Sequence, residues 1–132
     1  MKVFAKIKNS LNTNELVVTT KDKSKVISVP VKASGYGSAV SGGEFLLASL
    51  AACYCNDIYR EAAKRNINVS EVTVEVTGNF DAEGEPGTNF EYKPVIKSTA
   101  SAEQLRELIA HTDQVAEIHK TLRKGVSIGL VQ

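Results

Sequence analysis

The sequence predicts an α+β fold whose elements follow the order βββ–α–ββ–α–β. Two groups of alternating or β-branched segments, within residues 2–31 and 71–98, are typical of antiparallel strands. Between them lies a long apolar segment, residues 44–66, whose length favours a helix. A chain of 132 residues is enough for one core. We therefore expect a single domain over residues 1–132 that needs no disulfide or metal for its stability.

The first three elements form a predicted antiparallel meander. Each segment is rich in alternating or β-branched residues, and polar turn formers separate the segments. The expected strands cover residues 2–8, 16–20 and 26–31. Pro30 is typical of a strand end or an edge. The next segment, residues 33–43, holds four glycines and three serines and predicts a flexible loop. It lacks the Gly-Lys-Ser/Thr ending of a phosphate-binding loop.

The helix predicted over residues 44–66 begins with Glu44, an acidic residue that suits a helix N-terminus. Its first half is apolar nearly all round and should be buried. Its second half is amphipathic, and we expect Arg60 and Glu61 to face water. The helix would be roughly 35 Å long. A domain of this size can hardly surround so apolar a helix, so we expect a partner subunit to cover part of it.

The second half of the chain predicts a hairpin followed by helices. Two strands flank a loop rich in Gly, Pro and acidic residues, and a capping box of Ser101 and Gln104 begins a helix. A further helical turn ends at Gly125, after which a short last strand is expected. The strands, the second helical turn and the last strand cover residues 71–77, 90–98, 114–122 and 126–131.

Composition excludes several classes of protein. Lys and Arg number 16 against 15 acidic residues, a net charge of +1, which argues against a dedicated nucleic-acid binder. The longest apolar stretch, Phe45 to Cys55, is too short for a bilayer span of about 20 residues. Lysines interrupt the first eight residues, so no signal-peptide core is expected there. We therefore expect a cytoplasmic protein with reduced thiols and with no nucleic-acid or membrane partner.

The two cysteines, Cys53 and Cys55, lie in the predicted helix about 200° apart and cannot bond to each other. Cys55 shares its face with apolar residues and is expected to be a small buried hydrophobe. Cys53 shares its face with Asp57 and Arg60, which makes it the candidate nucleophile. A reactive thiol needs nearby positive charge, whereas Asp57 would raise its pKa and Arg60 lies two turns away. An activating cation would have to come from elsewhere.

Residues 43–53, Gly-Glu-Phe-Leu-Leu-Ala-Ser-Leu-Ala-Ala-Cys, resemble the start of the central helix of the OsmC/Ohr family. This family comprises osmotically induced proteins and organic hydroperoxide reductases. Residues 115–122 resemble its second motif, and residues 125–128 its closing segment. The resemblance covers essentially the whole chain. It implies an OsmC-like fold and an intertwined homodimer, with the central helices buried back to back and two active sites at the subunit interface.

The resemblance also implies a chemistry, and the chain matches it in part. Active members use a peroxidatic cysteine, a second cysteine that resolves the sulfenic acid, an arginine from the N-terminal strands and a glutamate. Cys53 matches the peroxidatic position, and Glu44 matches the glutamate of the osmotically-induced-like branch. Ala116 stands where the resolving cysteine is expected. The N-terminal strands contain no arginine, and lysine is not an equivalent replacement.

His119 completes the candidate catalytic residues, because the family geometry could bring it near Cys53. As an imidazolium it would lower the thiol pKa; alternatively it is a histidine at a helix rim. Glu44 likewise has an alternative role as a helix-terminal acid. The eight-residue gap between His111 and His119 is not a helical ligand spacing, so we expect no metal, and no cofactor is expected either.

Two functions stay open at this point. One is the thiol-dependent reduction of organic hydroperoxides or peroxide in an oxidative or osmotic stress response. Cys53 would be its nucleophile, and an external thiol would resolve the sulfenic acid. The other is a non-catalytic member of the same scaffold that binds a small apolar ligand in its dimer pocket.

Overall fold

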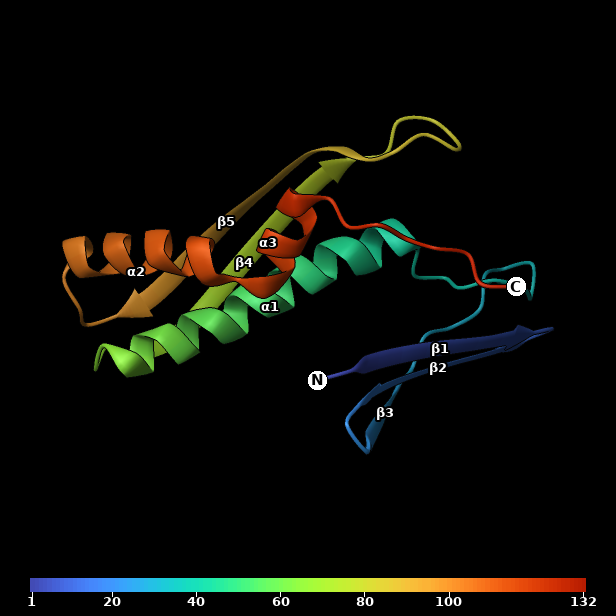
Figure 1. The fold of residues 1–132 in the computed structure, drawn as a ribbon, viewed down its shortest axis with the longest axis horizontal. Helices are drawn as coiled ribbons and strands as arrows, with labels where there is room; N and C mark the ends of the chain where they lie inside the picture. Colours follow the sequence, from blue (N-terminus) through green and yellow to red (C-terminus); the bar gives the residue numbers. More distant parts are fainter. The chain divides into compact units, whose positions relative to one another are not determined.

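The computed structural model describes residues 1–132 and divides into two compact units, Met1–Phe45 and Leu46–Gln132. Its five strands and three helices confirm the predicted α+β class (Figure 1). The first unit holds a three-stranded antiparallel sheet in the order β1-β2-β3. Its strands are β1 (Val3–Ser10), β2 (Thr13–Thr20) and β3 (Lys23–Ile27).

The strand boundaries in this sheet differ from the predicted ones. The first turn is shorter than expected, so β2 begins at Thr13. Asn12, the second residue of this two-residue turn, adopts a left-handed φ of 58°, a conformation that asparagine tolerates better than most residues. β3 begins earlier than predicted, at Lys23, and ends at Ile27. Beyond it, Val31 forms only an isolated bridge with Ser38.

The glycine- and serine-rich loop that follows is held by hydrogen bonds, although the sequence predicts a flexible loop. The Asn9 side chain accepts from the Gly37 N–H at 2.9 Å and donates to the Gly37 carbonyl at 3.0 Å. The Asn12 N–H donates to the Gly35 carbonyl at 2.7 Å. Gly35 has a φ of 90° and Gly37 a φ of 81°, a backbone conformation that glycine adopts most readily. The loop is therefore tied to β1 and to the turn that follows it.

The long helix α1 (Gly42–Lys64) matches the predicted helix to within two residues at each end. A capping box begins it: the Ser41 hydroxyl accepts from the Glu44 N–H at 3.1 Å, and the Glu44 carboxylate accepts from the Ser41 N–H at 2.9 Å. Past its last turn, Asn66 has a φ of 55°, the left-handed conformation that commonly follows the end of a helix.

In the second unit, α1 and α2 (Ala102–Val115) pack with the hairpin of β4 (Val69–Asn79) and β5 (Thr88–Ser98). Side chains point in turn to the two faces of the hairpin. Every second residue, counted from Val72 on β4 and from Tyr92 on β5, faces the helices. The centre of this core holds Tyr54 and Ile58 of α1 and Leu108 of α2. The period-two pattern of the sequence is thus confirmed as one buried and one exposed sheet face.

The chain turns sharply between α2 and α3 (Glu117–Lys124) at a single residue, Ala116. The predicted capping box is present at the start of α2, where the Ser101 hydroxyl accepts from the Gln104 N–H at 3.1 Å. Ala116 has extended backbone, so the helical segment predicted over residues 114–122 is split between the two helices. Ala116 is fully buried, and its small side chain lets α3 begin close to the core.

The last predicted strand, residues 126–131, is not formed. A strand needs a neighbouring strand for its backbone hydrogen bonds, and the chain pairs none with this segment. Its apolar side chains are left exposed, Ile128 to 94%. None of the helices combines the length and the apolar character that crossing a bilayer requires.

Candidate functional site

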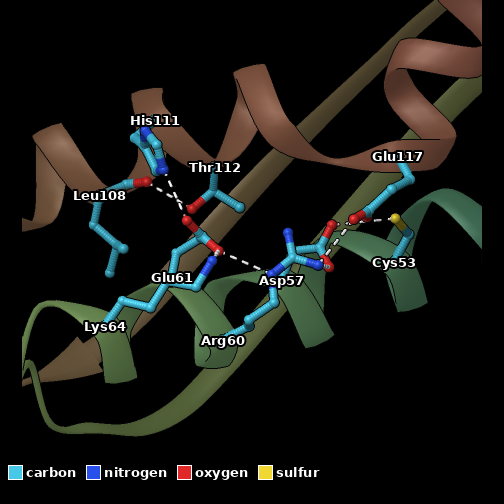
Figure 2. Close-up of polar contacts among 9 residues, drawn as sticks. All are labelled: Cys53, Asp57, Arg60, Glu61, Lys64, Leu108, His111, Thr112 and Glu117. Carbon is cyan, nitrogen blue, oxygen red and sulfur yellow. Dashed lines mark hydrogen bonds and ion pairs between the residues drawn. The ribbon is translucent and has the colours of Figure 1, made fainter.

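Cys53 lies on α1, half-buried, beside the first residue of α3. Its Sγ donates to Asp57 Oδ2 at 3.4 Å, one turn further along α1. Glu117 approaches from α3, and Sγ and carboxylate oxygens of Asp57 and Glu117 lie within 4.8 Å of one another (Figure 2). Two segments 60 residues apart in the sequence therefore meet at the thiol.

The surroundings of Cys53 keep its thiol protonated. Burial raises the pKa of the Cys53 thiol, and the charges of Asp57 and Glu117 raise it further. The backbone N–H of Ile118, in the first turn of α3, acts in the opposite direction and lowers this pKa. The effect of Asp57 agrees with the direction expected from the sequence. A base is therefore needed to remove the thiol proton near neutral pH.

Arg60 holds the two carboxylates that face the thiol. Its Nη1 lies 3.0 Å from Asp57 Oδ1 and 2.9 Å from Glu117 Oε1. Its Nε lies 2.8 Å from Glu61 Oε2. A guanidinium suits this task because its donors are fixed in one plane. Arg60 contacts the acidic partners of Cys53 rather than the sulfur itself, and it joins α1 to the start of α3.

Glu61 is buried, which corrects the expectation that it faces water. Only 4% of it is exposed. Its carboxylate accepts from Arg60 and also contacts Lys64 Nζ at 3.0 Å and His111 Nε2 of α2 at 2.8 Å (Figure 2). These hydrogen bonds, with Arg60 as the largest contributor, lower the pKa of Glu61 to about 2. Side chains on both α1 and α2 hydrogen-bond to the Glu61 carboxylate, and this offsets the cost of burying it.

The two carboxyls beside Cys53 differ in their acidity. Asp57 is 5% exposed, and burial raises its pKa. The pKa of Glu117 is lowered, mainly because its carboxylate accepts from its own backbone N–H at the start of α3. Asp57 therefore takes up a proton more readily than an ordinary aspartate does, while it keeps its contact with the thiol.

Cys53, Asp57 and Glu117 are also the residues whose ligand atoms lie close enough together to surround a metal ion. Arg60 already binds both carboxylates. A divalent cation would have to displace its guanidinium, so this set of groups fits an ion-paired thiol site better than a metal centre.

The other residues singled out from the sequence lie in different surroundings. Cys55 is half-buried and forms no disulfide, where full burial was expected. Glu44 is exposed, and its bonds to Ser41 lower its pKa and cap α1. This is the helix-terminal role that the sequence allows. A catalytic role of Glu44 stays a prediction.

His119 lies in an aromatic cluster on α3. It is 4% exposed, and its ring centroid is 4.6 Å from that of Tyr92 and 5.6 Å from that of Tyr54. Neither ring nitrogen has a hydrogen-bond partner in the protein, so no bond joins His119 to Cys53. Burial lowers the pKa of His119, which favours the neutral imidazole. A catalytic role of His119 also stays a prediction.

A cavity of about 220 Å³ lies against His119. Four elements of the second unit contribute to its wall: α1, β4, β5 and α3. Its lining is largely apolar and comprises Leu50, Val76, Phe90, Glu91, Tyr92, His119, Leu122 and Arg123. Cys53 does not line it. The cavity wall includes Leu50, one helical turn before Cys53, but not the thiol itself.

Sequence reasoning missed the grouping of Asp57, Arg60 and Glu117 around the thiol. The sequence places Asp57 and Arg60 on the Cys53 face of the helix but predicts that Arg60 faces water, and it gives Glu117 no role beyond its place beside Ala116. One signal was present: an acid directly after Ala116, within the second motif and at the start of a helix. That signal does not show which part of α1 the acid contacts.

Fold and site together define an α+β protein with a long central helix that carries one candidate thiol. The family model for "OsmC-like protein" matches residues 35–131. The chain therefore belongs to the OsmC-like family, as its motifs predict. A search of curated proteins finds no match.

Solved structures share the fold at low sequence identity. An OsmC-like protein from Mycoplasma pneumoniae is 21% identical, with 91% of this chain and 87% of that chain covered and a TM-score of 0.62. A putative organic hydroperoxide resistance protein from Vibrio cholerae, with captopril bound in one of its active sites, is 20% identical over 93% and 85%, with a TM-score of 0.60. The organic hydroperoxide resistance protein OhrB of Bacillus subtilis is 18% identical over 91% and 90%, with a TM-score of 0.54.

Proposed function

We propose that the protein reduces organic hydroperoxides through Cys53 and depends on an external thiol to complete the cycle. The observation that carries the proposal is the Cys53 Sγ donating to a buried Asp57, whose raised pKa suits proton transfer. Similar structures include proteins named for organic hydroperoxide resistance. Membership of the OsmC-like family supports the same class of chemistry.

In the proposed first step, Asp57 accepts the thiol proton as Sγ attacks the terminal oxygen of the hydroperoxide. The S–O bond forms while the O–O bond breaks, so the sulfur is oxidised and the peroxide is reduced. Asp57 then gives its proton to the departing alkoxide. The products are the Cys53 sulfenic acid and an alcohol, and no proton is gained or lost overall.

The second half of the cycle needs thiols from outside the chain. Ala116 stands in place of the resolving cysteine, and Cys55 is two residues along the same helix on a different face. One external thiol displaces water from the sulfenic acid to give a mixed disulfide, and a second thiol releases Cys53. The reducing cytoplasm, where we place the protein, would supply such thiols.

We also propose that the chain works as one OsmC-like domain over residues 1–132 within a homodimer. Large apolar side chains stay exposed in the second unit, among them Phe80, Val95 and the unpaired segment ending in Val131. A second copy would cover such a surface and could give residues 126–131 a strand partner. Sedimentation should give twice the mass of one chain. A monomer at micromolar concentration would contradict the dimer.

The direct test is to treat the reduced protein with cumene hydroperoxide and trap sulfenic acid with dimedone for mass spectrometry. We expect modification at Cys53 in the native chain and in Cys55→Ser, which is the matched control, and none in Cys53→Ser. Dithiothreitol should then support repeated turnover. Oxidation of Cys53 no faster than that of free cysteine would refute the proposal.

The raised thiol pKa and the cavity at His119 favour a second candidate function. In this alternative, the protein has lost the peroxidase pair and binds a small ligand without chemistry. The same experiment separates the two: ligand binding without Cys53 oxidation would favour the alternative. Glu44→Gln and His119→Gln would test the roles predicted for these residues, because a catalytic residue should lower the rate of Cys53 oxidation when it is replaced.

A further inference from the structure

The short helix α3 is anchored in the core by one buried side chain. Among its eight residues only His119 is buried, and all the others are exposed or partly exposed. The His119 ring lies against the rings of Tyr54 on α1 and Tyr92 on β5, at centroid distances of 5.6 and 4.6 Å. Such an anchor is usually an apolar side chain, which needs no polar partner in the core. Here it is a side chain that can take up a proton near neutral pH.

The surroundings of His119 suit the neutral ring and not its protonated form. Both ring nitrogens are closed off from solvent, and neither has a hydrogen-bond partner. An imidazolium carries a proton on each nitrogen. Its charge would therefore be buried with neither water nor an acceptor to stabilise it, which is costly. A protonated His119 is more stable where its ring has left the core.

The charged groups nearest to the ring do not offset this cost. Asp113 on α2 is an acid, but its Oδ1 already lies 2.7 Å from Arg123 Nη2 and also accepts from the Tyr92 hydroxyl. Arg123, one turn further along α3, carries the same charge as an imidazolium. Burial first and the charge of Arg123 second lower the pKa of His119, while Asp113 acts in the opposite direction.

The groups contributed by the other elements are uncharged or exposed. Burial raises the pKa of Tyr54 to about 12 and also raises that of Tyr92, so both ring neighbours stay neutral. On the cavity wall beside His119, β4 contributes the apolar Val76, and β5 contributes Glu91, which is exposed. Water screens an exposed carboxylate, so Glu91 does little for a buried charge.

The connections of α3 allow it to leave the core as a unit. It joins α2 through one non-helical residue, Ala116. Besides His119, it is held by ion pairs that are partly exposed to water, such as the one between Glu117 and Arg60. Pairs of this kind contribute little stability. The burial of the His119 ring is therefore the main contact that keeps α3 in place.

We propose that α3 is an acid-released latch: protonation of His119 moves its ring out of the aromatic cluster, and α3 swings away about Ala116. Release takes Glu117 away from the surroundings of Cys53. It also removes the α3 side of the cavity wall, to which His119 and Leu122 belong. The proposal does not require Cys53 to be reactive, so it stands or falls separately from the peroxide chemistry.

The direction of the pH effect follows from the protons bound in each state. Docked His119 has a lowered pKa, whereas the released ring regains its ordinary value of 6.5. The released state therefore binds more protons below pH 6.5, and docking loses stability as the pH falls below this value. Because one proton is involved, the released fraction should rise by up to about tenfold between roughly pH 7.5 and 5.5.

The test is amide hydrogen exchange of the full-length ¹⁵N-labelled protein, followed by NMR at these two pH values and corrected for the pH dependence of the chemical exchange rate. We expect the amides of α3 to lose protection at the lower pH, by up to about tenfold, while those of β4 and β5 keep theirs. Unchanged protection of α3 would overturn the proposal, and so would an equal loss in the hairpin, which would indicate global unfolding.

Two variants and one further measurement assign the effect to His119. His119→Phe keeps an aromatic anchor without a titratable group, and its α3 should be equally protected at both pH values. His111→Gln removes the other histidine and is the matched control, which should respond as the native chain does. A folded His119→Phe variant that still loses protection would overturn the proposal. If this variant does not fold, the native imidazole decides: a His119 that becomes protonated while its ring keeps its nuclear Overhauser contacts to Tyr54 and Tyr92 would overturn the latch.

Discussion

Cys53 and His119 lie near the same helix start, yet their surroundings are opposite. The thiol is surrounded by paired charges: Asp57 contacts it, and Arg60 ties Asp57 to Glu117. The imidazole is surrounded by aromatic rings and has no hydrogen-bond partner in the protein. In the first region, the charged side chains pair with one another within the protein. In the second region, both ring nitrogens of the buried His119 have no hydrogen-bond partner.

The two regions also differ in the groups that they contain. The thiol region has a nucleophile, a proton acceptor and a cation that holds the acids, but the described cavity is not there. The His119 region has the cavity but no nucleophile. Leu50, the α1 residue of the cavity wall, lies one helical turn before Cys53 on the same face of α1, so the two regions are neighbours along this helix.

The largest expected effect comes from breaking the aromatic region at Tyr54. This residue is fully buried, contacts Tyr92 and His119, and donates its hydroxyl to the Ile109 carbonyl at 2.8 Å. Tyr54→Ala should lower the free energy of unfolding by about 4 kcal/mol because it leaves a cavity in the core. Tyr54→Phe should lower it by only about 1 kcal/mol. Urea denaturation measures both, and equal losses would show that the ring does not carry the packing.

The charged region should be disrupted less severely by Arg60→Ala. This change leaves Asp57 and Glu61 buried without their shared cation, but the guanidinium is partly exposed to water. We therefore expect a loss of about 2 kcal/mol in the free energy of unfolding, below the 3–5 kcal/mol of a fully buried pair. Arg106→Ala is the matched control, because Arg106 is exposed on α2 and forms no ion pair; its effect should stay within about 0.5 kcal/mol. Similar losses in the two variants would contradict the network.

The two regions also differ in how far the sequence predicts them. Local patterns were sufficient for α1, the hairpin and the Ser101 capping box, because their signals lie within a few residues of one another. Glu61 was misplaced because a charged residue is normally exposed, and its burial depends on His111, 50 residues away. The segment 126–131 has strand-like residues but no partner strand in the chain. Such features depend on tertiary contacts that no local pattern contains.

Asp57→Asn should have a smaller effect, and it should separate the ionisation of the Cys53 thiol from proton delivery to the alkoxide. Asp57→Asn removes a charge that raises the Cys53 pKa, so alkylation by iodoacetamide near neutral pH should rise or stay unchanged. Reduction of cumene hydroperoxide should instead fall by about tenfold, because the alkoxide loses its proton donor. Stopped-flow measurements of both reactions give the comparison. A rise in both rates would show that Asp57 only suppresses the thiolate.

The pH dependence of stability should also change through Glu61. Its pKa is about 2 in the folded protein and has its ordinary value of 4.5 when the chain unfolds. A carboxyl with a depressed pKa contributes stability above its unfolded pKa and loses it as the pH falls toward its folded pKa. The denaturation midpoint of the native protein should therefore decrease between pH 4.5 and 2. Glu61→Gln should be less stable at neutral pH and should show a shallower decrease over this range. If the denaturation midpoints of the two proteins fall equally with pH, the ion pairs around Arg60 do not favour the ionised form of Glu61. The contrast between the charged region and the aromatic region would then be weaker than the geometry indicates.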